Sequence, residues 1–263
     1  MKIKIIRLLS ALFLFIALSS CSDVNETTGS STGDNSDRTQ VEIDSQETIT
    51  PTKIYTPVNE TLPVILNPIV VPVGRHPIID GTLSTGEWDD AAAETFADGS
   101  QLLLMQAEDY LYLGIKTHED QPFACNVYIL RGDKITVLHS SAALGTAIYQ
   151  KAESNWQQTQ NFNWQLRDTS NSESAQTERA AFLKTEGWLA ANGNMGTPNE
   201  LEYQIKIQEQ NLRIAVVFTK STSPYEKVPW PANLDDDTII PTPGGFPSIM
   251  AFFPTRWGLI EFD

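Results

Sequence analysis

The chain has 263 residues, with 33 acidic side chains against 18 basic ones and a formal net charge of −15 at pH 7. A negative surplus of this size argues against nucleic acid or anionic lipid head groups as main partners, because both carry the same sign of charge. With two cysteines in the whole sequence, the fold must depend on a hydrophobic core, which roughly 200 residues can supply.

Residues 1–20 have the features of a signal peptide. Three cations lie in the first seven residues, and an apolar run of 11 residues follows at positions 8–18. That run is shorter than the ~20 residues of a membrane-spanning helix. The next motif, Leu18-Ser19-Ser20-Cys21, resembles the lipobox of bacterial lipoproteins. The resemblance implies that signal peptidase II cuts before Cys21 and that its thiol carries diacylglycerol. A secretory signal with a chance cysteine is the alternative.

Lipidation at Cys21 would place the protein in the cell envelope. Processed lipoproteins carry several acyl chains, and two or more chains anchor a protein stably. Ser22 follows the cysteine, whereas aspartate at that position retains enteric lipoproteins in the inner membrane. The resemblance therefore favours the outer membrane. Cys125 is then left without a disulfide partner, and its alternation with Phe123 and Val127 predicts a buried strand position.

Residues 21–60 are rich in Ser, Thr, Asn, Asp and Glu, and Tyr55 is their only aromatic residue. Such a segment buries too little apolar surface to offset its ordering entropy. We therefore divide the chain into a signal peptide (1–20), a disordered tether (21–60) and a folded domain (61–263).

The folded domain has the pattern of an all-β protein. Its strand-like runs alternate apolar and polar residues, as in 201–207 and 212–218. These features predict an antiparallel β-sandwich of jelly-roll or immunoglobulin-like topology, with one or two short helices: one at 177–183 and a single helical turn at 88–93. The Gln-, Asn- and Ser-rich segment 153–176 is expected to be a long loop or insertion. The predicted strands are 101–106, 111–116, 123–130, 134–139, 201–207, 212–218 and 256–262.

Two passages carry a family resemblance. They are Ile79-Asp80-Gly81-Thr82-Leu83-Ser84-Thr85-Gly86-Glu87-Trp88-Asp89-Asp90-Ala91 and Asp109-Tyr110-Leu111-Tyr112-Leu113-Gly114-Ile115-Lys116. Together they resemble the opening of family 9 carbohydrate-binding modules and the related DOMON-like domains. The runs 202–207 and 256–262 are similar to later strands of the same family. The resemblance implies an antiparallel β-sandwich that binds sugars or, in some relatives, haem. Trp88 and Tyr112 are expected to pack in the core.

Carbohydrate binding requires flat aromatic side chains beside amide, carboxylate or guanidinium groups. Trp156 and Trp164 stand among asparagines and glutamines, and Arg167 follows closely. Trp188 and Trp230 are further candidates, the latter between two prolines. For each tryptophan the alternative is a core or loop-anchoring position.

No cofactor is expected, although calcium and haem each have candidate ligands in the sequence. The acidic run Asp235-Asp236-Asp237 could supply oxygen ligands to calcium, but it lacks the spacing of a calcium loop, and a solvated acidic loop is the alternative. Haem would need axial donors, for which the chain offers three histidines and a few methionines. These are His76, His118, His139, Met105, Met195 and Met250.

The sequence shows no catalytic motif, and no catalytic residue is assigned. The leading hypothesis is a membrane-anchored, non-catalytic lipoprotein that binds carbohydrate. The alternatives are a structural lipoprotein that contacts another envelope protein, and a haem-binding redox module.

Overall fold

The computed structural model describes residues 67–262, except 168, 169, 171, 233 and 235–248. They belong to the second of two units of the chain, Pro57–Asp263. The expectations for the signal peptide, Cys21, the tether and the acidic run 235–237 therefore lie outside the described residues.

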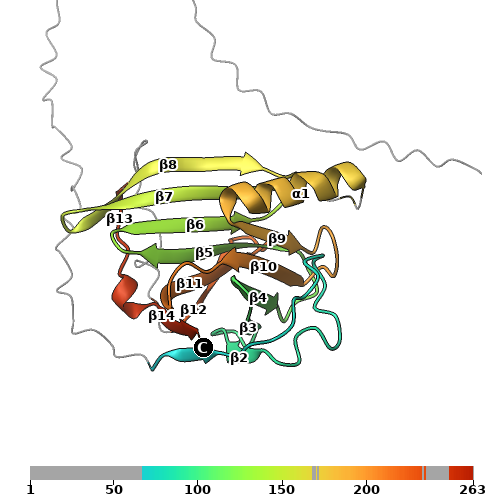
Figure 1. Cartoon of the computed structure of the whole chain (residues 1–263). Helices are drawn as coiled ribbons and strands as arrows, with labels where there is room; N and C mark the ends of the chain where they lie inside the picture. Colours follow the sequence, from blue (N-terminus) through green and yellow to red (C-terminus); the bar gives the residue numbers. More distant parts are fainter. Residues whose placement is uncertain (1–66, 168–169, 171, 233, 235–248, 263) are drawn as a thin grey trace, which may run out of the picture. The chain divides into compact units, whose positions relative to one another are not determined.

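Nine strands form a large sheet, in which β8, β7, β6 and β5 lie side by side (Figure 1). The order is β1-β14-β11-β5-β6-β7-β8-β13, and β12 pairs with β11. Neighbours are antiparallel except β1 and β14. The strands are β1 (Ile69–Val71), β5 (Phe123–Arg131), β6 (Lys134–Ser140), β7 (Leu144–Ala152), β8 (Asn155–Gln165), β11 (Asn211–Lys220), β12 (Glu226–Trp230), β13 (Ile249–Met250) and β14 (Gly258–Phe262).

Five strands form a smaller antiparallel sheet in the order β2-β3-β4-β10-β9. They are β2 (Ala92–Thr95), β3 (Gln101–Ala107), β4 (Tyr110–Lys116), β9 (Trp188–Asn192) and β10 (Glu200–Lys206). The two-sheet, all-β architecture confirms the predicted fold class, and every strand predicted from alternation coincides with an observed strand to within a few residues.

The main core lies between the inner faces of the two sheets. Alternate residues of β4 and β5, such as Leu113, Ile115, Val127 and Ile129, belong to one cluster of buried side chains. Cys125 is 1% exposed in this cluster, which confirms its predicted burial. Burial of this apolar surface is the main favourable term in the stability of the sandwich.

Each sheet also has an outer face that is partly covered. On the large sheet, Trp257 and Phe252 pack over strand residues such as Tyr128 and Tyr149. On the small sheet, Trp88 packs with Met105 and Tyr112. The expected burial of Trp88 and Tyr112 is confirmed, because they are 7% and 1% exposed.

The passages that carry the family resemblance meet in space at Glu202, which pairs with Gly114 of β4. Its carboxylate accepts hydrogen bonds from the backbone N–H groups of Asp80 and Gly81, at 2.9 and 2.8 Å, and from Trp88 Nε1 at 3.3 Å. Arg179 of the helix donates to the carbonyl of Ile79 at 2.7 Å. The 79–91 segment is thereby fastened to the outer face of the small sheet.

Two local predictions were wrong. Segment 153–176 is not a loop, because β8 runs through it as an 11-residue strand. The polar composition arises because most side chains of β8 remain at least partly exposed. Residues 88–93 do not form a helix, because turns at this point lead directly into β2.

The predicted helix at 177–183 is confirmed and is longer than expected. Helix α1 (Glu173–Glu186) begins after Ser172, whose hydroxyl accepts from Ala175 N–H. It ends at Gly187, which has φ of 74° and closes the helix through Leu183 O. Within the described ranges no helix is long and apolar enough to cross a membrane.

Candidate functional site

The outer face of the large sheet carries a transverse row of residues, one from each of six neighbouring strands. Register pairs link Pro229, Val217, Asn126, His139, Gly145 and Trp164 in that order. Residues paired across strands point to the same face of a sheet. The row therefore brings amide, imidazole and indole side chains from distant parts of the sequence together.

Trp164 is the exposed aromatic residue of this row, with 44% of its surface accessible. It stacks on the half-buried Phe162, with ring centroids 5.0 Å apart and planes 20° apart. We call these two rings the aromatic platform. Both approach the Cα of Gly145, where a Cβ would lie 2.8 Å from Trp164 Cε3 and 3.3 Å from Phe162 Cδ1. The absence of a side chain at position 145 leaves room for both rings to pack against β7.

His139 supports the platform from the neighbouring strand. Its ring lies edge-on to Trp164, with a centroid distance of 5.0 Å and an interplanar angle of 85°. Its Nδ1 is 2.7 Å from Asn126 Oδ1, and Asn126 Nδ2 donates to Tyr128 OH at 3.1 Å. Since Asn126 Oδ1 can only accept, this network assigns the proton to Nδ1 and leaves Nε2 as an acceptor.

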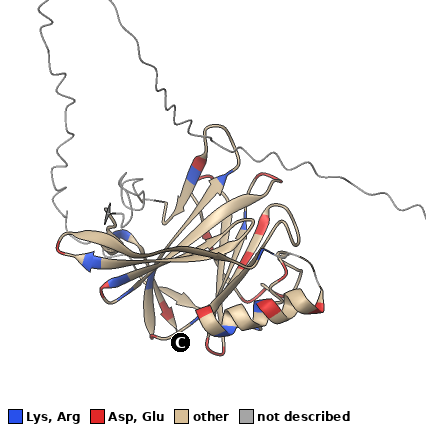
Figure 2. Cartoon of the chain, turned by 90° about the horizontal axis from the view of Figure 1, so that it is seen from above, with Lys and Arg blue, Asp and Glu red and all other residues tan. Residues whose placement is uncertain are grey.

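Burial sets the charge of these groups. Desolvation lowers the pKa of His139 to about 4, so its imidazole is neutral at pH 7. Desolvation likewise raises the pKa of Tyr128, which keeps the phenol protonated. Figure 2 shows the strands mostly free of charged residues, which gather more at hairpins and on α1. The side chains that form and support the platform, Trp164, Phe162, His139 and Asn126, are therefore aromatic or hydrogen-bonding and uncharged at pH 7.

Of the side chains predicted to contact ligand, Trp164 lies on the platform and Arg167 lies exposed just beyond the end of β8. Trp156 is 5% exposed, and its Nε1 donates to Phe252 O at 3.2 Å. Trp188 and Trp230 lie in the core between the sheets, at 1% and 3% exposure. Those two indoles cannot stack on a ligand from solvent, because core side chains cover their faces.

The two interior indoles have specific packing partners. Trp188 Nε1 donates to Thr146 Oγ1 at 3.0 Å, and its ring contacts Phe182 of α1 edge-on at 5.3 Å. Trp230 lies against Gly258, where a Cβ would approach its ring to 2.4 Å. Both residues therefore fix the packing of the two sheets and do not contribute to the site.

Three residues of the site were missed by sequence reasoning as ligand contacts: Phe162, His139 and Asn126. The sequence does place Phe162 and Trp164 two residues apart, which is the spacing of side chains on one face of a strand. This spacing could have indicated that the two rings lie together. The pairing of His139 with Asn126 follows from the β5–β6 register, which the sequence does not display. Among the described residues, no group of three or more His, Cys, Asp or Glu side chains is placed to hold a metal ion.

Comparison with known proteins gave two similar solved structures. One is a family 9 carbohydrate-binding module from Caldicellulosiruptor kristjanssonii in complex with cellotriose, at 12% identity and a TM-score of 0.39, covering 75% of this chain and 94% of that one. The other is a putative carbohydrate-binding protein from Bacteroides uniformis, at 9% identity and a TM-score of 0.41, covering 74% and 98%. No protein-family model and no curated protein sequence matches the chain.

Proposed function

We propose that the protein is a non-catalytic carbohydrate-binding lipoprotein and that its sugar site is the aromatic platform of Trp164 and Phe162. The observation that carries the proposal is the exposed Trp164 indole, which packs against a stacked ring, an edge-on imidazole and a glycine on the outer face of the large sheet. A pre-positioned aromatic ring loses little conformational entropy on binding.

The chemistry of the platform fits a sugar ring. The apolar C–H face of a pyranose can stack on the indole, while its hydroxyl groups need hydrogen-bond partners at the edge of the ring. With Asn126 Oδ1 facing His139 Nδ1, His139 Nε2 is an acceptor next to the indole. An uncharged aromatic and hydrogen-bonding surface of this kind suits a neutral sugar.

A glycan array probed with the purified full chain tests the proposal. We expect binding to a restricted set of glycans and loss of at least about tenfold in affinity in Trp164→Ala, since tryptophans that anchor a ligand commonly contribute ~2 kcal/mol or more. Tyr225→Ala is the matched control, because Tyr225 is 79% exposed on the β11–β12 hairpin, outside the transverse row. An array without signal, or equal affinities for both variants, would remove the proposal.

We also propose that Cys21 carries the lipid anchor and that the protein resides in the outer membrane. The support is the positive start, the short apolar run and the Leu18-Ser19-Ser20-Cys21 motif. Anchoring would hold the platform close to the membrane surface, where the polar residues 22–60 would act as a spacer.

A further inference from the structure

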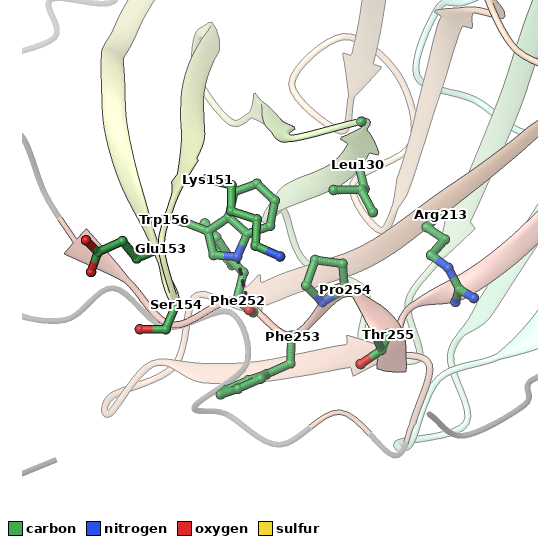
Figure 3. A pocket seen from close by; sticks show the side chains of 11 residues that line it. Leu130, Lys151, Glu153, Ser154, Trp156, Arg213, Phe252, Phe253, Pro254 and Thr255 are labelled. Atoms are coloured by element: carbon green, nitrogen blue, oxygen red, sulfur yellow. Dashed lines mark hydrogen bonds between the residues drawn. The ribbon is translucent and has the colours of Figure 1, made fainter. Parts of the chain in front are cut away.

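A hollow apart from the aromatic platform lies on the outer face of the large sheet, with a cavity volume of about 230 Å³ (Figure 3). The turn between β7 and β8 and the segment 252–255 line it, together with two cationic side chains, Lys151 and Arg213. Pockets for drug-sized ligands span ~300–1,000 Å³. A cavity of this size has room for one sugar ring. We call it the cationic cavity.

Among the described residues, the two cations of the cavity have no acidic partner. In the part of the chain that the structure describes, neither Lys151 nor Arg213 forms an ion pair. Arg213 donates one hydrogen bond to the backbone carbonyl of Trp257 at 3.3 Å, which orients the guanidinium and uses only part of its donor capacity. In a chain with net charge −15, two unpaired cations around one hollow point to an anionic ligand.

The remaining lining residues restrict the kind of anion. The carboxylate of Glu153 also belongs to the lining, but Figure 3 shows it pointing away from the Lys151 ammonium. The formal charge of the lining is therefore +1, which matches a monoanion better than a phosphate dianion. Ser154 and Thr255 add hydroxyl groups, and the buried Trp156 adds an aromatic wall. Hydroxyl and aromatic groups beside a cation suit a sugar that carries a carboxylate.

We propose that the cationic cavity binds the carboxylate of an acidic sugar of the hexuronic acid class. Lys151 would pair with the carboxylate, Arg213 would add positive charge at the edge of the cavity, and the hydroxyls at the rim would contact the ring. Trp156, expected from the sequence to bind ligand beside Trp164, would then contribute as a wall of this second site.

The cationic cavity is separate from the aromatic platform. Gly145 pairs with Trp164 near one end of the β7–β8 hairpin, and Lys151 pairs with Trp156 near the other. Gly145 and Lys151 are six residue steps apart along β7, which corresponds to roughly 20 Å at ~3.3 Å per residue. One monosaccharide cannot reach both sites, so their binding can be measured independently.

Calorimetric titration of the full chain with D-glucuronate, at low ionic strength, tests the inference. Lys151→Met is expected to weaken glucuronate binding about five- to tenfold, since the side chain is exposed and its charge partly screened. Lys184→Met is the matched control, because it removes an exposed lysine on α1 without touching the cavity. Thermal melting of both variants checks that the fold is retained.

Further arms decide between ligand classes. D-Glucose and inorganic phosphate should each bind at least fivefold more weakly than glucuronate. If glucose binds as tightly as glucuronate, the carboxylate has no role and the inference is overturned. If phosphate binds as tightly, the cavity is an unselective anion site and the inference for an acidic sugar is likewise overturned. Equal affinities of the Lys151→Met and Lys184→Met variants would also overturn the inference. Trp164→Ala should bind glucuronate as the unmodified chain does, whatever the glycan array shows; loss of binding there would refute a separate site.

Discussion

Gly145→Ala should weaken glycan binding without unfolding the protein. The added Cβ would lie 2.8 and 3.0 Å from Trp164 Cε3 and Cζ3, and 3.3 Å from Phe162 Cδ1. Ordinary contact begins near 3.4 Å, so the indole has to retreat by roughly 0.6 Å or tilt away from β7. The substitution therefore displaces the platform and leaves its chemistry unchanged.

The expected magnitudes follow from exposure. Overpacking an enclosed site costs ~1–3 kcal/mol, but Trp164 is 44% exposed and its ring can move toward solvent. We expect a loss of stability of about 1 kcal/mol or less, equivalent to ~2–4 °C in Tm for a domain of this size. Misalignment of a binding tryptophan should weaken the affinity for glycan about tenfold. This loss is smaller than the ~2 kcal/mol or more that such a residue commonly contributes, because the ring is displaced and not removed.

A double-mutant cycle separates displacement from other effects. Kd for a glycan identified on the array is measured for the parent chain, Gly145→Ala, Trp164→Ala and the double variant. If Gly145→Ala acts by moving the indole, its effect disappears once the indole is removed, so the double variant should bind like Trp164→Ala. An unchanged Kd in the single variant, or additive losses in the double variant, would refute the platform geometry.

Three further predictions concern buried charge and anchoring. Glu202→Gln should destabilise the fold by ~1–3 kcal/mol, because an amide NH₂ would replace one oxygen that now accepts from Trp88 Nε1 or from backbone N–H groups. Denaturant titration measures the free energy of unfolding, and a loss below ~0.5 kcal/mol would contradict the prediction. Desolvation raises the pKa of Glu202 from 4.5 to about 7, so the folded state holds a proton that the unfolded state has released, and this group makes stability fall as pH rises from about 4.5 to 7. His139 has the opposite sign: with its pKa lowered from 6.5 to about 4, its contribution is lost as pH falls from 6.5 to 4, and His139→Gln should remove that loss. Stability profiles of the two variants that matched the parent profile after a constant offset would count against both assignments. Cys21→Ser should move the protein from the membrane fraction to the soluble fraction and remove the mass of the attached acyl chains in mass spectrometry. Retention of the variant in the membrane fraction would contradict the lipid-anchor proposal.

The sequence predicted strands well where one face is buried and the other is polar. Residues 201–207 and 212–218 alternate clearly because each strand has one face in the core. β8 escaped prediction because most of its side chains remain partly or fully exposed, so its composition resembles that of a loop. Apolar and polar residues alternate along a strand only when one face of the strand is buried and the other is exposed to solvent.

The fate of each tryptophan could not be predicted from its local setting. Trp156 and Trp164 have similar polar neighbours, yet Trp156 is covered by Phe252, which lies 96 residues later in the chain. Trp188 is buried by contacts with Thr146 and Phe182. Burial here depends on long-range pairing, whereas the local sequence records only the near neighbours.

The central claim is that a sugar stacks on Trp164, and nuclear magnetic resonance of the indole Nε1–H groups tests it most directly. During titration with a glycan identified on the array, the Trp164 indole signal should shift progressively and saturate, while the signal of the buried Trp188 should stay in place. A Trp164 signal that remains unmoved at saturating glycan would contradict the claim.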